Sequence, residues 1–202
     1  MDAFLPALEE IAAGKRELRA VRHPLGFLCL PLVRHGPDGV CLHLFGPEHD
    51  AGGPPAAPPM HAHSWELLSH VLYGEVGNVH VDVRDDPAGA THRVFEVRVG
   101  PDGVDEIRPT GRRVRAEPGA THISTAGQAY ALGAGVFHST VVTPGLAAAT
   151  LVEGRSVPGG RDLSLGPLDG PPRRTTRLLC GTEDTIRAVR TALGRIHAER
   201  RP

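Results

Sequence analysis

The sequence predicts an all-β domain, either a barrel or a sandwich, with one helix at each end. Short apolar runs recur through the middle of the chain, each ended by Gly, Pro or Asp, as in WELLSHVLYG and VFHSTVV. Apolar and polar residues alternate in NVHVDVR and HRVFEVRV, which is typical of half-buried strands. We find no alternation of strands with helical patterns. Many short strands separated by turn residues therefore favour a barrel or sandwich over a parallel α/β sheet.

Apolar residues at helical spacing mark the two ends of the chain. The first helix is predicted over residues 2–13, where Phe4, Leu8 and Ile11 share a face and Gly14 can end the helix. The second lies at the C-terminus, where Thr182 or Asp184 can cap it. Its apolar stripe consists of Ile186, Val189, Leu193 and Ile196. We expect an N-terminal helix in 1–19, a barrel in 20–156, and a linker with a helix that packs on the barrel in 157–202.

Composition narrows the class of function. The 202 residues suit one domain, and the formal net charge is −1 without a large basic block, so no nucleic-acid partner is expected. No apolar run is long enough to cross a bilayer, and the first residues do not resemble a signal peptide. The three cysteines include no CxxC pair and do not suggest a disulfide framework. We expect a cytoplasmic protein without membrane association.

The stretch PMHAHSWELLSHVLYGEVGN, residues 59–78, suggests a metal site. Side chains alternate between the faces of a strand, so His61 and His63 point the same way and can reach one cation. Neutral imidazole is a good ligand for iron, nickel, zinc, copper and manganese. A third inward histidine from another strand could complete the set, and His138 in GQAYALGAGVFHSTVV is the candidate.

These two segments resemble the paired motifs of the cupin superfamily. His61-Ala62-His63 is followed by Gly74 at the spacing of the first motif. Gly127 is followed by Gly133-Ala134-Gly135-Val136-Phe137-His138, as in the second motif, except that Gly133 replaces a proline. Val142 replaces the closing asparagine. The resemblance implies a cupin fold, a double-stranded β-helix or jelly-roll barrel, and homodimers of the kind that cupins often form.

The glutamate of the first cupin motif has no clear counterpart. Its slot falls on Leu67 or Leu68, and Glu66 faces away from the histidines on ideal alternation, although a β-bulge could turn it inward. Without a carboxylate, the site resembles that of the thiol dioxygenase branch, typified by cysteine dioxygenase. That resemblance implies Fe(II), with Ni, Mn or Zn as alternatives. It also implies a small thiol or other small anionic metabolite as substrate, with dioxygen as co-substrate.

Other residues are candidates for contacts with the substrate. Tyr130 precedes His138 and could offer its hydroxyl to a reacting group, which would make it catalytic. His43 and His122 each lie in or at the start of a strand-like run and could line the pocket or bind a ligand. Arg34 lies about as far before the first motif as the carboxylate-binding arginine of cysteine dioxygenase-like proteins. Glu66, if it turned inward, would contact the same pocket.

Two other functions remain open at the level of sequence. Metal-dependent cupins include sugar isomerases and epimerases, and an inward Glu66 would favour these because their sites use a carboxylate ligand. The chain could also be a cupin that binds a small molecule without catalysis. A fold that hosts many chemistries does not choose among these functions.

Overall fold

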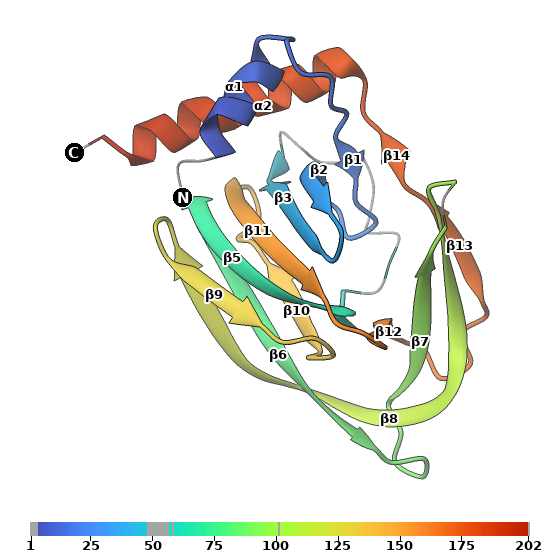
Figure 1. The fold of residues 1–202 in the computed structure, drawn as a ribbon. Coiled ribbons are helices and arrows are strands. Elements are labelled where there is room, and N and C mark those ends of the chain that lie inside the picture. Colours follow the sequence, from blue (N-terminus) through green and yellow to red (C-terminus); the bar gives the residue numbers. More distant parts are fainter. Residues whose placement is uncertain (1–3, 48–56, 58, 101, 202) are drawn as a thin grey trace.

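The computed structural model describes residues 4–47, 57, 59–100 and 102–201, which form two antiparallel sheets and two helices (Figure 1). The helices are α1 (Leu5–Ala12) and α2 (Thr182–Glu199). The strands are β1 (Val21–Arg22), β2 (Leu28–His35), β3 (Asp38–Phe45), β4 (His61–Ala62), β5 (Trp65–Tyr73), β6 (Glu75–Asp85), β7 (His92–Val99), β8 (Val104–Thr125), β9 (Ala129–Leu132), β10 (His138–Val141), β11 (Ala148–Ser156), β12 (Asp162–Gly166), β13 (Arg173–Thr176) and β14 (Leu178–Leu179). The expected mostly β fold with a helix near each end is thus confirmed.

The strands divide into two sheets of seven. The first has the order β14-β1-β2-β3-β11-β5-β9, and the second has the order β13-β8-β6-β10-β4-β12-β7. The long strand β8 also pairs with β7 through its first half and with β6 through its second half. The ladders of the second sheet therefore lead from β8 through β6, β10, β4, β12 and β7 back to β8.

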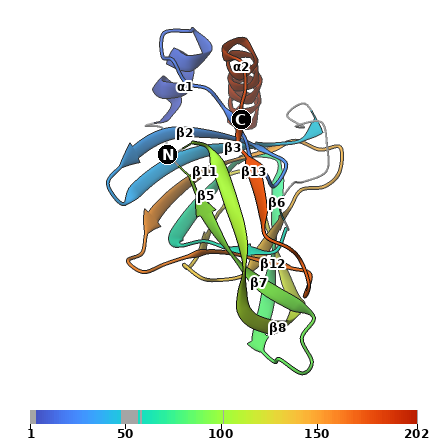
Figure 2. The ribbon, with the colours of Figure 1, turned by 90° about the vertical axis from the view of Figure 1, so that its right-hand side faces the viewer.

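Alternation in β2 and β3 gives the first sheet two different faces. Leu28, Leu30, Leu42 and Leu44 are buried in a core that also contains Leu8, Ile11, Val189 and Ile196 of the helices. Both helices lie together over this outer face of the sheet (Figures 1 and 2). The intervening residues of the two strands point the opposite way, toward the interior between the sheets.

Both helices lie within the regions where the apolar stripes predict them. Residues 2 and 3 of the first predicted helix lie outside the described residues. Within the described part of the chain, neither helix combines the length and the apolar character that crossing a membrane requires.

The stretch expected to be a linker contributes strands to both sheets. β12 pairs with β4 and β7, β13 pairs with β8, and β14 pairs with β1. Glycine and proline lie on either side of the short run DLSLG, a pattern typical of a loop. Its pairing with β4 instead brings Asp162 and the short strand that carries His61 together.

Candidate metal centre and its cavity

Three histidines of the second sheet converge on one point. His61 lies in β4, and His138 at the start of β10 is its direct cross-strand partner. His63 is the first residue after the end of β4. One ring nitrogen from each of the three lies within 4.8 Å of the other two. The ring centroids are 4.4 Å apart for His61 and His138, and 4.7 Å apart for His61 and His63. This grouping could hold a metal ion, as the two sequence motifs suggest.

Backbone contacts orient two of these rings. His61 Nδ1 lies 2.8 Å from the carbonyl oxygen of Pro59, and His138 Nδ1 lies 3.1 Å from that of Val136. A carbonyl only accepts hydrogen bonds, so each Nδ1 carries the proton in these contacts, and each Nε2 keeps a lone pair for a metal. The amide of Gly135 donates to the carbonyl of His63 at 2.9 Å, which ties the loop before His138 to the histidine pair. Gly135 has a φ of +78°, a conformation that glycine adopts readily.

The surroundings keep the three imidazoles neutral. Burial lowers the pKa of His138 to about 4, and the charge of His61 adds to the effect. Burial, followed by His61 and His138, holds the pKa of His63 well below its ordinary value. Burial also lowers the pKa of His61, although the contact with Pro59 and the carboxylate of Asp162 oppose it. Neutral imidazole is the form that binds a metal.

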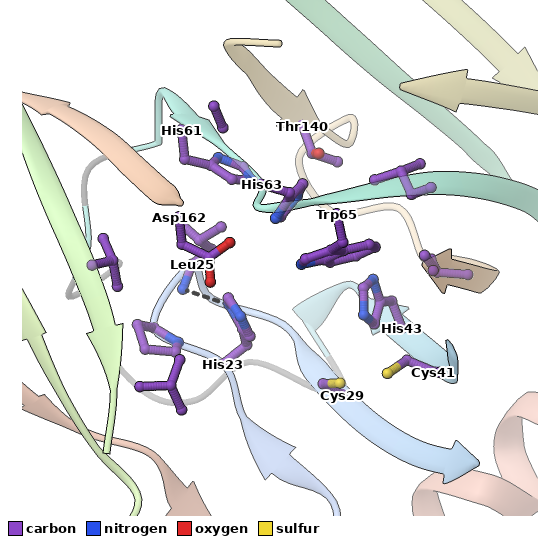
Figure 3. Close-up of a pocket in the computed structure, with 18 of the residues that line it drawn as sticks. His23, Leu25, Cys29, Cys41, His43, His61, His63, Trp65, Thr140 and Asp162 are labelled. Atoms are coloured by element: carbon purple, nitrogen blue, oxygen red, sulfur yellow. Dashed lines mark hydrogen bonds between the residues drawn. The ribbon is translucent and has the colours of Figure 1, made fainter. Parts of the chain in front are cut away.

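The histidines line a cavity of about 420 Å³. Of the residues that the sequence suggested, His43 in β3, Tyr130 in β9 and Arg34 in β2 also line it. Trp65 does as well, with its ring centroid 4.4 Å from that of His63. In Figure 3 His61, His63 and Trp65 lie along one side of the cavity, and His43 projects from a strand on another side. The pocket therefore brings three histidines that could hold a metal, a guanidinium and a phenol into one space.

Two suggested residues lie elsewhere. Glu66 is exposed, whereas its neighbour Leu67 is buried and lines the cavity. β5 pairs regularly with β11 at Glu66, and the irregularity between these strands lies at Ala149 and Thr150, so no bulge turns the carboxylate inward. His122 is exposed in β8 and is likewise not among the residues that line the cavity. Neither Glu66 nor His122 lines this cavity, so the structure does not support the substrate contacts expected of them.

Sequence reasoning also missed residues of the cavity. His23 stacks on Phe27 with a centroid distance of 4.4 Å, and burial holds its pKa well below the ordinary value. Asp162 accepts a hydrogen bond at 2.7 Å from the amide of Ser64. Cys29 and Cys41 line the cavity from β2 and β3. The alternation Cys41-Leu42-His43 was the one local signal, since it resembles the spacing of His61 and His63.

Comparison with known proteins shows no family. No family model matches the chain, and no curated protein matches it. Among solved structures, the chain is similar to the crystal structure of the DMSP lyase DddQ from Ruegeria pomeroyi DSS-3, at 16% identity and a TM-score of 0.34. The alignment covers 73% of this chain and 51% of that one, so this chain spans about half the length of DddQ. A TM-score of this size does not establish a common fold.

Proposed function

We propose that this protein is a mononuclear metal-dependent oxygenase, with Fe(II) held by His61, His63 and His138. The observation that carries the proposal is the convergence of these three rings on one wall of a cavity. Within the described part of the chain, that group contains no carboxylate. The proposed substrate is a small thiol or another small anionic metabolite, with dioxygen as co-substrate, as the resemblance of the motifs to the thiol dioxygenase branch implies.

The donor set fits a divalent metal. Three neutral imidazoles on one side leave coordination positions open toward the cavity, and as ligands they contribute no negative charge to balance that of the cation. An anionic substrate is therefore favoured over a neutral one. Bound Fe(II) would supply the redox chemistry that protein side chains lack.

Two other residues of the cavity could contact an anionic substrate. Arg34 offers a guanidinium that can bind a carboxylate through two hydrogen bonds. The Tyr130 hydroxyl can donate a hydrogen bond to a reacting oxygen or sulfur atom. Trp65 and the buried Leu67 present apolar surface that limits the access of water to the histidines. The exposed position of Glu66 removes the feature that favoured a sugar isomerase.

Metal analysis of anaerobically purified protein, followed by oxygen uptake with a panel of small thiols, tests the proposal. We expect one iron at the histidine group and oxygen consumption with at least one thiol. His61→Ala, His63→Ala and His138→Ala should each lose that iron and the activity together. His122→Ala is the matched control, because this histidine is exposed outside the cavity, and it should keep both. Tyr130→Phe should keep the iron and lower turnover.

Two outcomes would contradict the proposal. Iron-loaded protein that consumes no oxygen with any thiol, yet converts a sugar or keto compound anaerobically, would be an isomerase. Protein that does neither but binds a small molecule tightly would be a binding protein.

A further inference from the structure

A second group of metal-ligating side chains lines the same cavity, outside the three-histidine group. It consists of Cys29, Cys41 and His43, and one ligand atom from each lies within 4.8 Å of the other two. All three are partly buried. Figure 3 shows both cysteine side chains and His43 projecting into the cavity from the strands that lie beneath the helices.

This group has the same construction as the three-histidine group. Cys41 and His43 are two residues apart on β3, as His61 and His63 are two apart at β4, so each pair shares a face. Cys29 on β2 is the direct cross-strand partner of His43, just as His138 is the partner of His61. Each sheet thus presents two candidate ligands that are two residues apart in the sequence and a third from a neighbouring strand.

We propose that Cys29, Cys41 and His43 form a second metal site, for a thiophilic cation such as Zn²⁺, with its open position toward the cavity. Thiolate sulfur and imidazole nitrogen are the ligands that zinc prefers, and three protein ligands with one open position are typical of zinc sites that bind an exogenous ligand. Two thiolates would balance the charge of the cation in this partly buried place. The three-histidine group offers no sulfur, so the two sites differ in the metals they prefer.

The local geometry favours metal binding over a disulfide. The cross-strand partner of Cys41 is Pro31, and Cys29 and Cys41 are therefore diagonal neighbours. Diagonal positions lie roughly 7–8 Å apart in an antiparallel pair, which is longer than the usual Cα separation across a disulfide.

Cobalt binding to metal-free, fully reduced protein tests the second site without depending on the oxygenase activity. Co²⁺ replaces Zn²⁺ in such sites, and its bond to thiolate sulfur gives an intense charge-transfer band in the near ultraviolet. We expect wild-type protein to bind two equivalents of Co²⁺ and to show this band. The double variant His61→Ala/His138→Ala should keep the band and bind one equivalent, because it retains the sulfur site alone.

Cysteine variants provide the matched comparison. Cys41→Ser and Cys29→Ser should each lose the charge-transfer band and still bind one equivalent of Co²⁺. Cys180→Ser should keep the band and both equivalents of Co²⁺, because Cys180 lies in the core with the helices. Protection from alkylation gives a readout that needs no variant. Zn²⁺ should shield Cys29 and Cys41 of wild-type protein from iodoacetamide, as read by mass spectrometry.

Several results would overturn the second site. These are a wild-type protein with three reduced thiols and no band, a band that survives in Cys29→Ser/Cys41→Ser, or Cys29 and Cys41 alkylated equally with and without Zn²⁺. Wild-type protein that binds only one equivalent of Co²⁺, shared by both groups, would also overturn the second site. If wild-type protein lacked only the equivalent of Co²⁺ bound by the histidines, the result would count against the proposed oxygenase and not against the second site.

Discussion

The buried imidazole of His138 should make the stability of the metal-free protein depend on pH. Its pKa is lowered to about 4, first by burial, whereas in the unfolded chain it is near 6.5. Between these values the unfolded state binds more protons, so the free energy of unfolding should fall as the pH drops from about 6.5 to about 4. The contribution of this one group is on the order of 3 kcal/mol.

Urea denaturation of metal-free protein at pH 7 and near pH 4 measures this effect at the level of one residue. His138→Gln should reduce the loss of stability between the two pH values. His122→Gln, which changes an exposed histidine, should leave it unchanged. An identical loss of stability in wild-type protein and His138→Gln would show that other groups cause the pH dependence. His61 and His63 should add to it with the same sign, because their pKa values are also lowered.

At the scale of elements, the turn between β5 and β6 depends on Gly74. Its φ is +73°, and a Cβ atom there would lie 2.3 Å from the backbone oxygen of Ala147. Gly127 has a similar φ of +83°, but nothing lies within 4 Å of the place of its Cβ. Gly127→Ala should therefore cost about 1–2 kcal/mol from backbone strain alone. Gly74→Ala should cost roughly 1–3 kcal/mol more, because the backbone must also shift. Equal losses in urea denaturation would contradict this account.

The segment between β13 and β14 is fixed to β8 by an ion pair. Arg177 Nε lies 2.7 Å from Asp105 Oδ2, and the Asp105 side chain is only 3% exposed. Arg177→Ala leaves a buried carboxylate without this partner and should destabilise the fold by about 3 kcal/mol or more. The double variant Arg177→Ala/Asp105→Ala should be less destabilised than the sum of the single variants, as a double-mutant cycle in urea can measure. Additive losses would mean that the pair contributes nothing of its own.

At the scale of the whole molecule, the sequence predicts what is local and misses what depends on strand pairing. His61 and His63 could be found because two residues on one strand suffice to place both on one face. Cys29 joins Cys41 and His43 only through the register of β2 with β3, which no local pattern states. Likewise, β12 becomes a strand through its pairing with β4 and β7. Which face of a strand is inward depends on its neighbours. The sequence alone therefore could not show that His122 lies outside the cavity.

The core beneath the helices and the histidine-lined cavity lie on opposite faces of the first sheet, so they should contribute to stability independently. Leu8 is fully buried in that core, away from the cavity, and Leu8→Ala should lower the free energy of unfolding by about 2–5 kcal/mol. Ni²⁺, which imidazole binds well, should raise the free energy of unfolding by about 3 kcal/mol when the free metal concentration is roughly one hundred times Kd. A Cys41→Ser background keeps the sulfur group from contributing. Because distant sites are additive, Leu8→Ala should leave the gain from Ni²⁺ unchanged, whereas His138→Ala should abolish it. Urea denaturation with and without Ni²⁺ measures both, and the account fails if Leu8→Ala reduces the gain or His138→Ala preserves it.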